Sequence, residues 1–243
     1  MSLKSVYLPA FSFHDNRIRI TDEEHHHLVV GRAEPGELIE VFDGKGNVWT
    51  AAVETVSKRE TIGVLKESRM VPPPSVDLIL GIALIRTAAL ELALEKAVEI
   101  GVTRVVPFTA AHSNAVAGNR HDRWSRIVIE AAKQSKRYHV PAIDAVAKFD
   151  QVLAIPASTK IVFAERDGGP LQSALAGSPA LYLIGPEGGW TDAEISAARK
   201  CGFHSVTLGA GILKAETAAI VGGALIRYEL GEGKPEARSQ EPE

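Results

Sequence analysis

The chain has 243 residues, enough for one large domain or two small ones. Its 45% of hydrophobic and 23% of charged residues are typical of a globular protein, and a net charge of −3 does not by itself favour nucleic-acid binding. The single cysteine excludes an intramolecular disulfide and a cysteine-rich zinc site. No apolar run is long enough for a signal peptide or a membrane span, so we expect a cytoplasmic protein.

The N-terminal part has the pattern of a small β-barrel with one short helix, which is expected over 22–30. Short β-like segments at 38–42, 48–53 and 61–65 are separated by turn signals. Three consecutive prolines in 71–75 lack backbone donors and favour an extended linker. We therefore expect a barrel domain over 1–71, a second domain over 72–231, and a disordered tail over 232–243, where Gly, Pro and Glu are frequent.

After the linker, strands and helices alternate, which predicts an α/β fold with a mainly parallel sheet and flanking helices. Strands are expected at 76–85, 104–108, 160–164, 180–184 and 205–208. Helices are expected at 88–100, at 120–138, from the capping box at 191–194 to Gly202, and at 215–230.

Two glycine-rich loops each join a predicted strand to a predicted helix. Residues 183–190 are Leu-Ile-Gly-Pro-Glu-Gly-Gly-Trp, and residues 208–219 are Leu-Gly-Ala-Gly-Ile-Leu-Lys-Ala-Glu-Thr-Ala-Ala. We expect the loops side by side at the carboxyl ends of neighbouring strands, where open α/β sheets bind ligands. The alternative is a pair of tight turns without a ligand. Phosphate-binding motifs do not match, because Lys214 replaces the third glycine of G-x-G-x-x-G and lacks the P-loop neighbours.

The histidines give weaker indications. His25, His26 and His27 are consecutive, and consecutive residues on a helix point in different directions, so we expect no metal site. His112 follows a predicted strand at a plausible site position, but a structural hydrogen bond is favoured over a catalytic role there.

The helix expected over 120–138 carries a basic stripe. Residues 119–139 hold six Lys or Arg residues against two acidic ones, and such a patch can bind phosphates even on an acidic protein. The alternative is a solvated helix face.

Both glycine-rich motifs resemble those of one family. Gly185-Pro-Glu-Gly-Gly189 and Leu213-Lys-Ala-Glu-Thr-Ala218 are similar to the hallmark motifs of the SPOUT-class methyltransferases (RsmE type) that methylate N3 of a uridine in small-subunit ribosomal RNA. Further similar segments occur at 42–46, 95–102 and 130–141, so the resemblance covers about residues 5–230. It implies an N-terminal PUA-like RNA-binding barrel, a trefoil-knotted SPOUT domain and a homodimer.

The resemblance also implies S-adenosylmethionine as cofactor and 16S RNA or the assembled 30S subunit as substrate. The expected cofactor-binding residues are Ile184, Gly185, Glu187, Gly188, Leu208, Gly209, Ile212 and Leu213. Lys214 is the expected catalytic cation, which would stabilise the uridinate, and Glu216 would orient it. The expected RNA-binding residues are Arg17, Arg19, Arg32, Arg86, Arg120, Arg123, Arg126, Lys133 and Arg137.

The chain departs from the family pattern where charges are common. Ala89, Gly211 and Ala111-His112 stand at positions that are often charged, Lys214 replaces an Arg, and Lys133 replaces a Glu. Two alternatives therefore stay open: an RNA-binding or ribosome-assembly protein that has lost catalysis, and a SPOUT methyltransferase with another RNA target.

Overall fold

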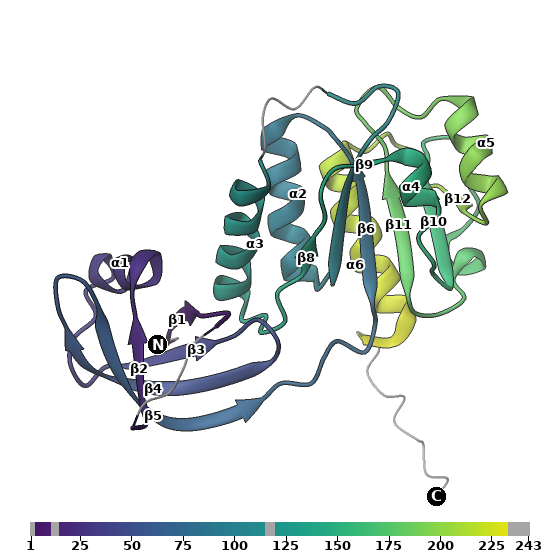
Figure 1. Cartoon of the computed structure of the whole chain (residues 1–243). Coiled ribbons are helices and arrows are strands. Elements are labelled where there is room, and N and C mark those ends of the chain that lie inside the picture. Colours follow the sequence, from purple (N-terminus) through teal and green to yellow (C-terminus); the bar gives the residue numbers. More distant parts are fainter. Residues whose placement is uncertain (1–2, 11–14, 115–119, 233–243) are drawn as a thin grey trace, which may run out of the picture. The chain divides into compact units, whose positions relative to one another are not determined.

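The computed structural model describes residues 3–10, 15–114 and 120–232, and the chain divides into two compact units (Figure 1). The first unit comprises Met1–Pro73 and Ile129–Val140, and the second comprises Pro74–Val128 and Pro141–Glu243. The expected tail falls almost wholly on 233–243, outside the described residues. Within the described ranges, no helix is long and apolar enough to cross a membrane.

The first unit is a curled five-stranded sheet with one helix. Its strands are β1 (Lys4–Tyr7), β2 (Arg17–Ile20), β3 (Leu38–Phe42), β4 (Asn47–Val56) and β5 (Thr61–Met70), in the order β1-β3-β4-β5-β2, and the helix is α1 (Asp22–Val30). Strand β2 shows why the sheet has an inner face: Ile18 and Ile20 are buried, while Arg17 and Arg19 between them are exposed. Strands β1 and β2 were not predicted, because four residues with two apolar positions give too short a pattern.

A buried carboxylate holds the segment 129–140 in the first unit. Glu40 is 8% exposed and accepts hydrogen bonds from Lys136 Nζ at 2.9 Å, Tyr138 Oη at 2.9 Å and Arg69 Nη2 at 3.1 Å. Burial alone would raise the pKa of Glu40, but these three donors outweigh it and hold the pKa below its ordinary value. A segment distant in sequence therefore belongs to the barrel unit, which no local pattern indicated.

The second unit is a parallel sheet with helices. Its strands are β6 (Leu78–Ala83), β7 (Arg104–Thr109), β8 (Ala142–Ile143), β9 (Ala147–Lys148), β10 (Thr159–Phe163), β11 (Ala180–Ile184) and β12 (His204–Val206). Its helices are α2 (Thr87–Ile100), α4 (Phe149–Leu153), α5 (Asp192–Lys200) and α6 (Ala215–Arg227), with short helical turns at Leu171–Ala174 and Tyr228–Glu232. The helix α3 (His121–Ser135) begins in this unit, and its residues from Ile129 onward belong to the first unit. The strand order is β12-β10-β11-β6-β7-β8, with β9 also on β7, and every pairing is parallel. The predicted parallel sheet with flanking helices is confirmed.

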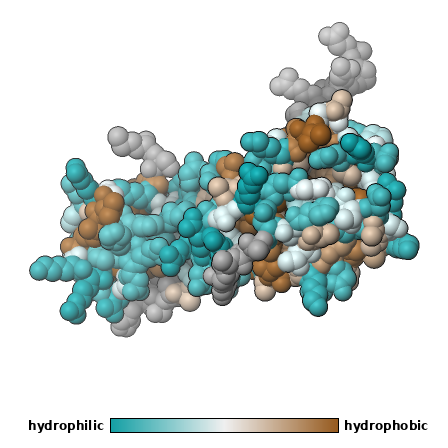
Figure 2. Space-filling view, turned by 90° about the horizontal axis from the view of Figure 1, so that it is seen from above, coloured by the Kyte–Doolittle hydropathy of each residue, from teal (hydrophilic) through white to brown (hydrophobic). Residues whose placement is uncertain are grey.

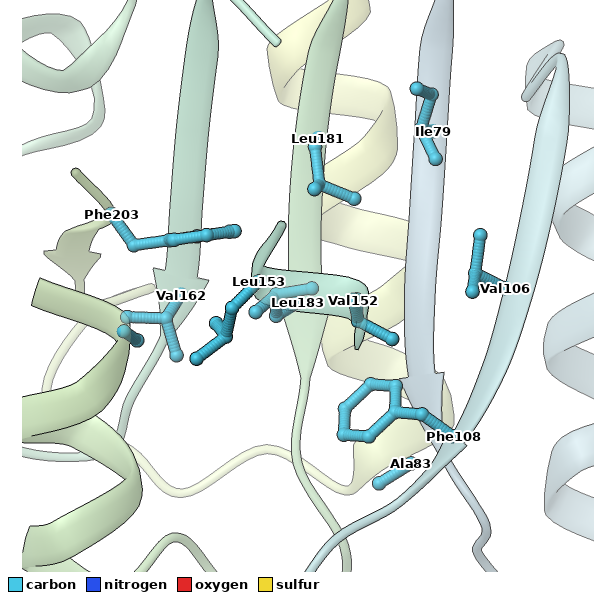
Figure 3. Packing of buried hydrophobic residues seen from close by; sticks show 11 residues of the cluster. Ile79, Ala83, Val106, Phe108, Val152, Leu153, Val162, Leu181, Leu183 and Phe203 are labelled. Carbon is cyan, nitrogen blue, oxygen red and sulfur yellow. The ribbon is translucent and has the colours of Figure 1, made fainter. Parts of the chain in front are cut away.

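Both faces of this sheet are buried, and its central strands β6 and β11 are buried at every position. Figure 3 shows Val152 and Leu153 of α4 against Leu183, Val162 and Phe108 on one face, with α6 behind the sheet. On the opposite face, Tyr182 donates its hydroxyl to the carbonyl of Ala219 in α6. The outer surface is mixed, and the face in Figure 2 shows hydrophilic residues with smaller hydrophobic groups between them.

Glycines allow α6 to lie close to the sheet. A Cβ added at Gly222 would lie 2.4 Å from Cε2 of Phe163, and one at Gly223 would lie 2.5 Å from Oη of Tyr182. Because both positions are buried, only residues without a side chain fit there at this helix–sheet distance.

The structure corrects one expectation about the sheet. Strands β11 and β12, which precede the two glycine-rich loops, are not neighbours, because β10 lies between them. A parallel strand order is set by crossover connections and long-range packing, and the local pattern around each loop carries no information about it.

Candidate functional site

The glycine-rich loops both lie at the carboxyl edge of the parallel sheet. The first runs from Gly185 to Trp190 between β11 and α5, and the predicted capping box is present: Thr191 Oγ1 accepts from the backbone N–H of Glu194 at 3.2 Å. The second runs from the end of β12 to Lys214, which is the N-cap of α6. Because all pairings are parallel, the loop after β10 reaches the same edge and lies between them.

A cavity of about 1530 Å³ lies among these loops. Seven of the eight expected cofactor-binding residues line it: Ile184, Gly185, Glu187, Gly188, Leu208, Ile212 and Leu213. The eighth, Gly209, is not part of the wall. Its φ of +105° makes the turn after β12 instead, a conformation that favours glycine.

Other lining residues were not predicted. Five come from the end of β10 and the loop that follows it, Phe163 to Asp167, and others include Trp190 of the first loop and Ala89 and Leu92 of α2. A signal for the β10 group existed in the sequence, since a predicted strand ended there and ligand sites follow such ends. We did not use this signal, because we expected β11 and β12 to be neighbours, with no strand between them.

The cavity combines apolar walls with balanced charge. Apolar side chains include Leu92, Phe163, Ile184, Trp190 and Leu213. Five basic residues line it (Arg86, Arg166, Arg199, Lys200 and Lys214), together with five acidic ones (Glu165, Asp167, Glu187, Asp192 and Glu216). Such a wall suits a ligand with an apolar ring system and groups of both charges.

Two glycines of the first loop face side chains, and one glycine of the second faces open space. A Cβ at Gly185 would lie 2.8 Å from Trp190, and a Cβ at Gly188 would lie 2.9 Å from Cβ of His112. At Gly211, which lines the cavity, an added Cβ would meet no atom within 4 Å. A side chain at Gly211 would therefore begin in open space.

The expected catalytic residues Lys214 and Glu216 both line the cavity. Lys214 is exposed, and its backbone carbonyl accepts the first helical bond of α6 from Ala218 at 2.9 Å. Over the described ranges no hydrogen bond or ion pair joins Lys214 to Glu216, so the expected orienting contact is not formed in this structure. The lysine is therefore free to meet a ligand.

Five of the nine expected RNA-binding residues have acidic partners. Arg17 pairs with Glu54 at 2.8 Å, Arg19 pairs with Glu60, and Nη2 of Arg123 donates to Glu91 at 2.7 Å. These side chains are exposed, and exposed ion pairs are weak enough for a phosphate to replace the partner. Arg86 lies 3.8 Å from Glu187 and is 83% exposed.

The fifth, Lys133, does not fit the expectation. Its side chain is 8% exposed, and Nζ lies 3.0 Å from Glu24, 2.9 Å from Glu130 and 2.8 Å from Nδ1 of His27. It is thus a buried structural cation of the first unit, and we remove it from the RNA-binding set. The basic stripe gave no sign of this, because the acidic partner Glu24 lies on α1.

Among the remaining members, Arg32 and Arg126 are exposed, Arg120 and Arg137 are half-buried, and the buried Nε of Arg120 has no hydrogen-bond partner in the described part of the chain.

The consecutive histidines have separate roles. His25 is 7% exposed and bonds to the hydroxyl of Thr61 at 2.9 Å. His27 forms with Glu24 and Glu130 a group whose spacing could hold a metal ion, but the ammonium of Lys133 lies within hydrogen-bond distance of all three. That cation supplies the positive charge the three ligand atoms need.

His112 is placed as a structural hydrogen-bonding residue. Its Nδ1 lies 3.1 Å from the carbonyl of Gly189, and a carbonyl only accepts, so Nδ1 carries the proton. The side chain is not among the residues that line the cavity.

Comparisons with known proteins agree with this geometry. A family model described as an RNA methyltransferase domain matches residues 72–227, and one described as an RNA methyltransferase PUA domain matches residues 20–66. Two proteins named ribosomal RNA small subunit methyltransferase E are similar to the chain. The one from Synechocystis is 33% identical over 225 residues (88% of this chain, 73% of that protein), and the one from Mesomycoplasma hyopneumoniae is 34% identical over 174 residues (69% and 75%).

A solved structure is similar over almost the whole chain. The small subunit methyltransferase E of Neisseria gonorrhoeae, solved bound to S-adenosylmethionine, has a TM-score of 0.88 and 29% identity and covers 94% of this chain and 98% of its own.

Proposed function

This chain belongs to the ribosomal RNA small subunit methyltransferase E family, and from that membership we propose that it methylates N3 of a uridine in the 16S RNA of the small ribosomal subunit. It is an S-adenosylmethionine-dependent ribosomal RNA methyltransferase with a PUA-like N-terminal domain and a SPOUT-type second domain. The trefoil knot concerns the threading of the chain, which strand order does not test, and it stays part of the proposal. The observation that carries the proposal is the cavity among the loops after β6, β10, β11 and β12.

The residues of the cavity fit S-adenosylmethionine. The apolar walls suit an adenine ring, and carboxylates and cations are both present for an amino-acid end and a sulfonium. Backbone groups near Ile184, Gly188 and Leu213 would hold the cofactor, and the open space at Gly211 leaves room for it. When bound, the cofactor supplies an electrophilic methyl group.

Lys214 is the proposed catalytic cation. Uridine N3 carries a weakly acidic proton that would pass to solvent water, and the negative charge left on the base would spread onto its oxygens. The N3–carbon bond would then form as the bond between the methyl carbon and the sulfonium sulfur breaks. An exposed ammonium in the cavity wall can stabilise that charge, and the cavity loops would hold N3 about 3–3.5 Å from the methyl carbon. Glu216 lines the same cavity and would orient Lys214 by electrostatic attraction.

RNA contacts are proposed on each unit separately. On the first unit they are Arg17, Arg19, Arg32 and Arg137, and on the second they are Arg86, Arg120, Arg123 and Arg126. The target base would have to be unstacked to reach the cavity.

We also propose a homodimer formed through α6 and the turn after it. Leu225 and Tyr228 are 40% and 49% exposed there, and Leu92 on α2, which packs against α6, is 41% exposed. Exposed apolar side chains on two packed helices are typical of a subunit interface.

The test is a tritium-transfer assay with labelled S-adenosylmethionine on 16S RNA and on 30S subunits that lack the modification. The proposal expects label in the RNA and N3-methyluridine in its nucleoside digest. Label in another nucleoside would support a different RNA target. Cofactor and RNA binding without any transfer would support the inactive assembly protein, which the missing charges at Ala89 and Gly211 of the cavity wall favour.

A further inference from the structure

One carboxylate links three loops around the cavity. Glu187, in the loop between β11 and α5, accepts from the backbone N–H of Arg86 with Oε1 at 2.9 Å and from Nδ2 of Asn114 with Oε2 at 2.8 Å. Arg86 directly precedes α2, and Asn114 lies in the loop after β7. These partners are 101 and 73 residues away along the chain, so one side chain joins three segments that are distant in sequence. The backbone N–H of Asn114 also donates to the carbonyl of Leu84 at 2.8 Å.

Further contacts connect the loop after β7 to the same glycine-rich loop and to the start of α5. The N–H of Ala111 donates to Oε1 of Glu194 at 2.8 Å, and Nδ1–H of His112 donates to the carbonyl of Gly189 at 3.1 Å. The close approach of Gly188 to Cβ of His112 leaves no room for a side chain between the loops. The two loops are therefore packed as well as hydrogen-bonded.

Both carboxylate oxygens of Glu187 are already used within the protein. Its side chain is 31% exposed and lines the cavity, yet each oxygen has a protein donor. Asn114 is not among the residues that line the cavity. The side-chain amide of Asn114 donates to Glu187, so removing that amide would act on the cavity wall through this bond.

We infer that Glu187 is a positioning residue: with Asn114 it fixes the glycine-rich loop against the loop after β7 and the start of α2, and so preforms one wall of the cavity. A wall that is fixed before binding lowers the entropy cost of ordering it around a ligand. The inference deepens the proposed function, on which it rests for the identity of the ligand, S-adenosylmethionine.

Four variants test this role: Glu187→Ala, Asn114→Ala, the double variant and Glu187→Gln. In Glu187→Gln, the side-chain oxygen can still accept from the N–H of Arg86. The new side-chain NH₂ can donate to the side-chain oxygen of Asn114 once the Asn114 amide has rotated, so both bonds can re-form. Glu95→Ala is the matched control, because it removes a carboxylate of the same unit that bonds to Lys96 and does not line the cavity.

The first measurement is amide hydrogen exchange on the ligand-free full chain. Asn114→Ala is expected to speed hydrogen exchange at the N–H of Arg86, to which Asn114 has no direct bond. Glu187→Ala is expected to speed hydrogen exchange at the N–H groups of Ala111 and Asn114. Glu187→Gln and Glu95→Ala should match the wild type. Unchanged exchange at Arg86 in Asn114→Ala would overturn the inference, whatever the ligand is.

The second measurement is the Kd for S-adenosylmethionine by titration calorimetry. Loss of one hydrogen bond to a charged group should weaken binding about tenfold in each single variant, with no further loss in the double variant and recovery in Glu187→Gln. Weaker binding in Glu187→Ala alone would instead make Glu187 a direct ligand and overturn the positioning role. A wild type that binds no S-adenosylmethionine would contradict the proposed function, and the exchange result would still decide the inference.

Discussion

Lys214 is the residue on which the proposed chemistry depends most. It combines an exposed ammonium, a place in the cavity wall and a backbone fixed as the N-cap of α6. The motif around it could be identified from sequence. The lack of a bond between Lys214 and Glu216 could not be predicted, because it depends on the direction of the two side chains in the first turn of α6.

Replacing this cation should affect transfer and spare cofactor binding. We expect Lys214→Ala to lower the single-turnover rate of methyl transfer about 10²-fold, the usual cost of one lost charge-stabilising donor, and to leave the Kd for S-adenosylmethionine within about twofold. Lys148→Ala, an exposed lysine outside the cavity, is the control. An unchanged rate in Lys214→Ala would remove it from the catalytic role.

Glu194 gives a residue-scale prediction for pH. Burial raises the pKa of its carboxyl, but the bonds from Thr191 and from the N–H of Ala111 outweigh burial and hold the pKa below the ordinary 4.5. A lowered folded-state pKa means that the stabilisation is present above about pH 4.5 and is lost as pH falls through the folded value.

We therefore expect the melting temperature of the wild type to fall below pH 4.5 more steeply than that of Glu194→Gln. The variant should also be about 1 kcal/mol less stable at pH 7, because the capping box is weakened. Glu95→Gln is the matched control. Equal slopes for Glu194→Gln and the wild type would contradict the assignment.

At the scale of elements, the long strands and helices could be predicted and their order in the sheet could not. Apolar runs with clear ends located β6, β7, β10 and β11, because strands of a parallel sheet that is buried on both faces are mostly apolar. The insertion of β10 between β11 and β12 follows from crossover connections that leave no local pattern, and it brings Phe163–Asp167 into the cavity wall.

The packing of α6 on the sheet depends on Gly222. Alanine favours a helix over glycine by about 1 kcal/mol, yet here its Cβ would lie 2.4 Å from the ring of Phe163. We expect Gly222→Ala to lower the free energy of unfolding by about 1–3 kcal/mol in urea denaturation, since overpacking dominates. Ala224→Ser, at an exposed position of the same helix, should change it little. A more stable Gly222→Ala would show that the helix can move away from the sheet.

At the scale of the whole molecule, composition and the proline linker predicted two parts. The sequence did not predict that residues 129–140 belong to the first unit. Residues 129–140 belong to the barrel unit because Glu40 and Glu24 bind Lys136 and Lys133. Both pairings join residues about a hundred positions apart. Patterns in a single sequence indicate only contacts between residues that are close along the chain.

The proposed dimer is tested at this scale. A charge in an apolar interface is costly, so Leu225→Asp should convert a dimer into a monomer in light scattering coupled to gel filtration. Val30→Asp, at a 67% exposed apolar position of the barrel, should stay dimeric. A dimeric Leu225→Asp would place the interface elsewhere.

The most direct test of the central claim, that this cavity is the methyl-donor site, is calorimetric titration of S-adenosylmethionine into the wild type and into Gly211→Ala, Gly211→Val and Gly211→Trp. Because a Cβ at Gly211 meets no atom of the chain within 4 Å, these side chains should fill the cavity without disturbing the fold, which melting curves would verify. We expect micromolar binding by the wild type, weaker binding as the side chain at position 211 grows, and no binding by Gly211→Trp. Equal affinity in all four proteins, or no binding to the wild type, would contradict it.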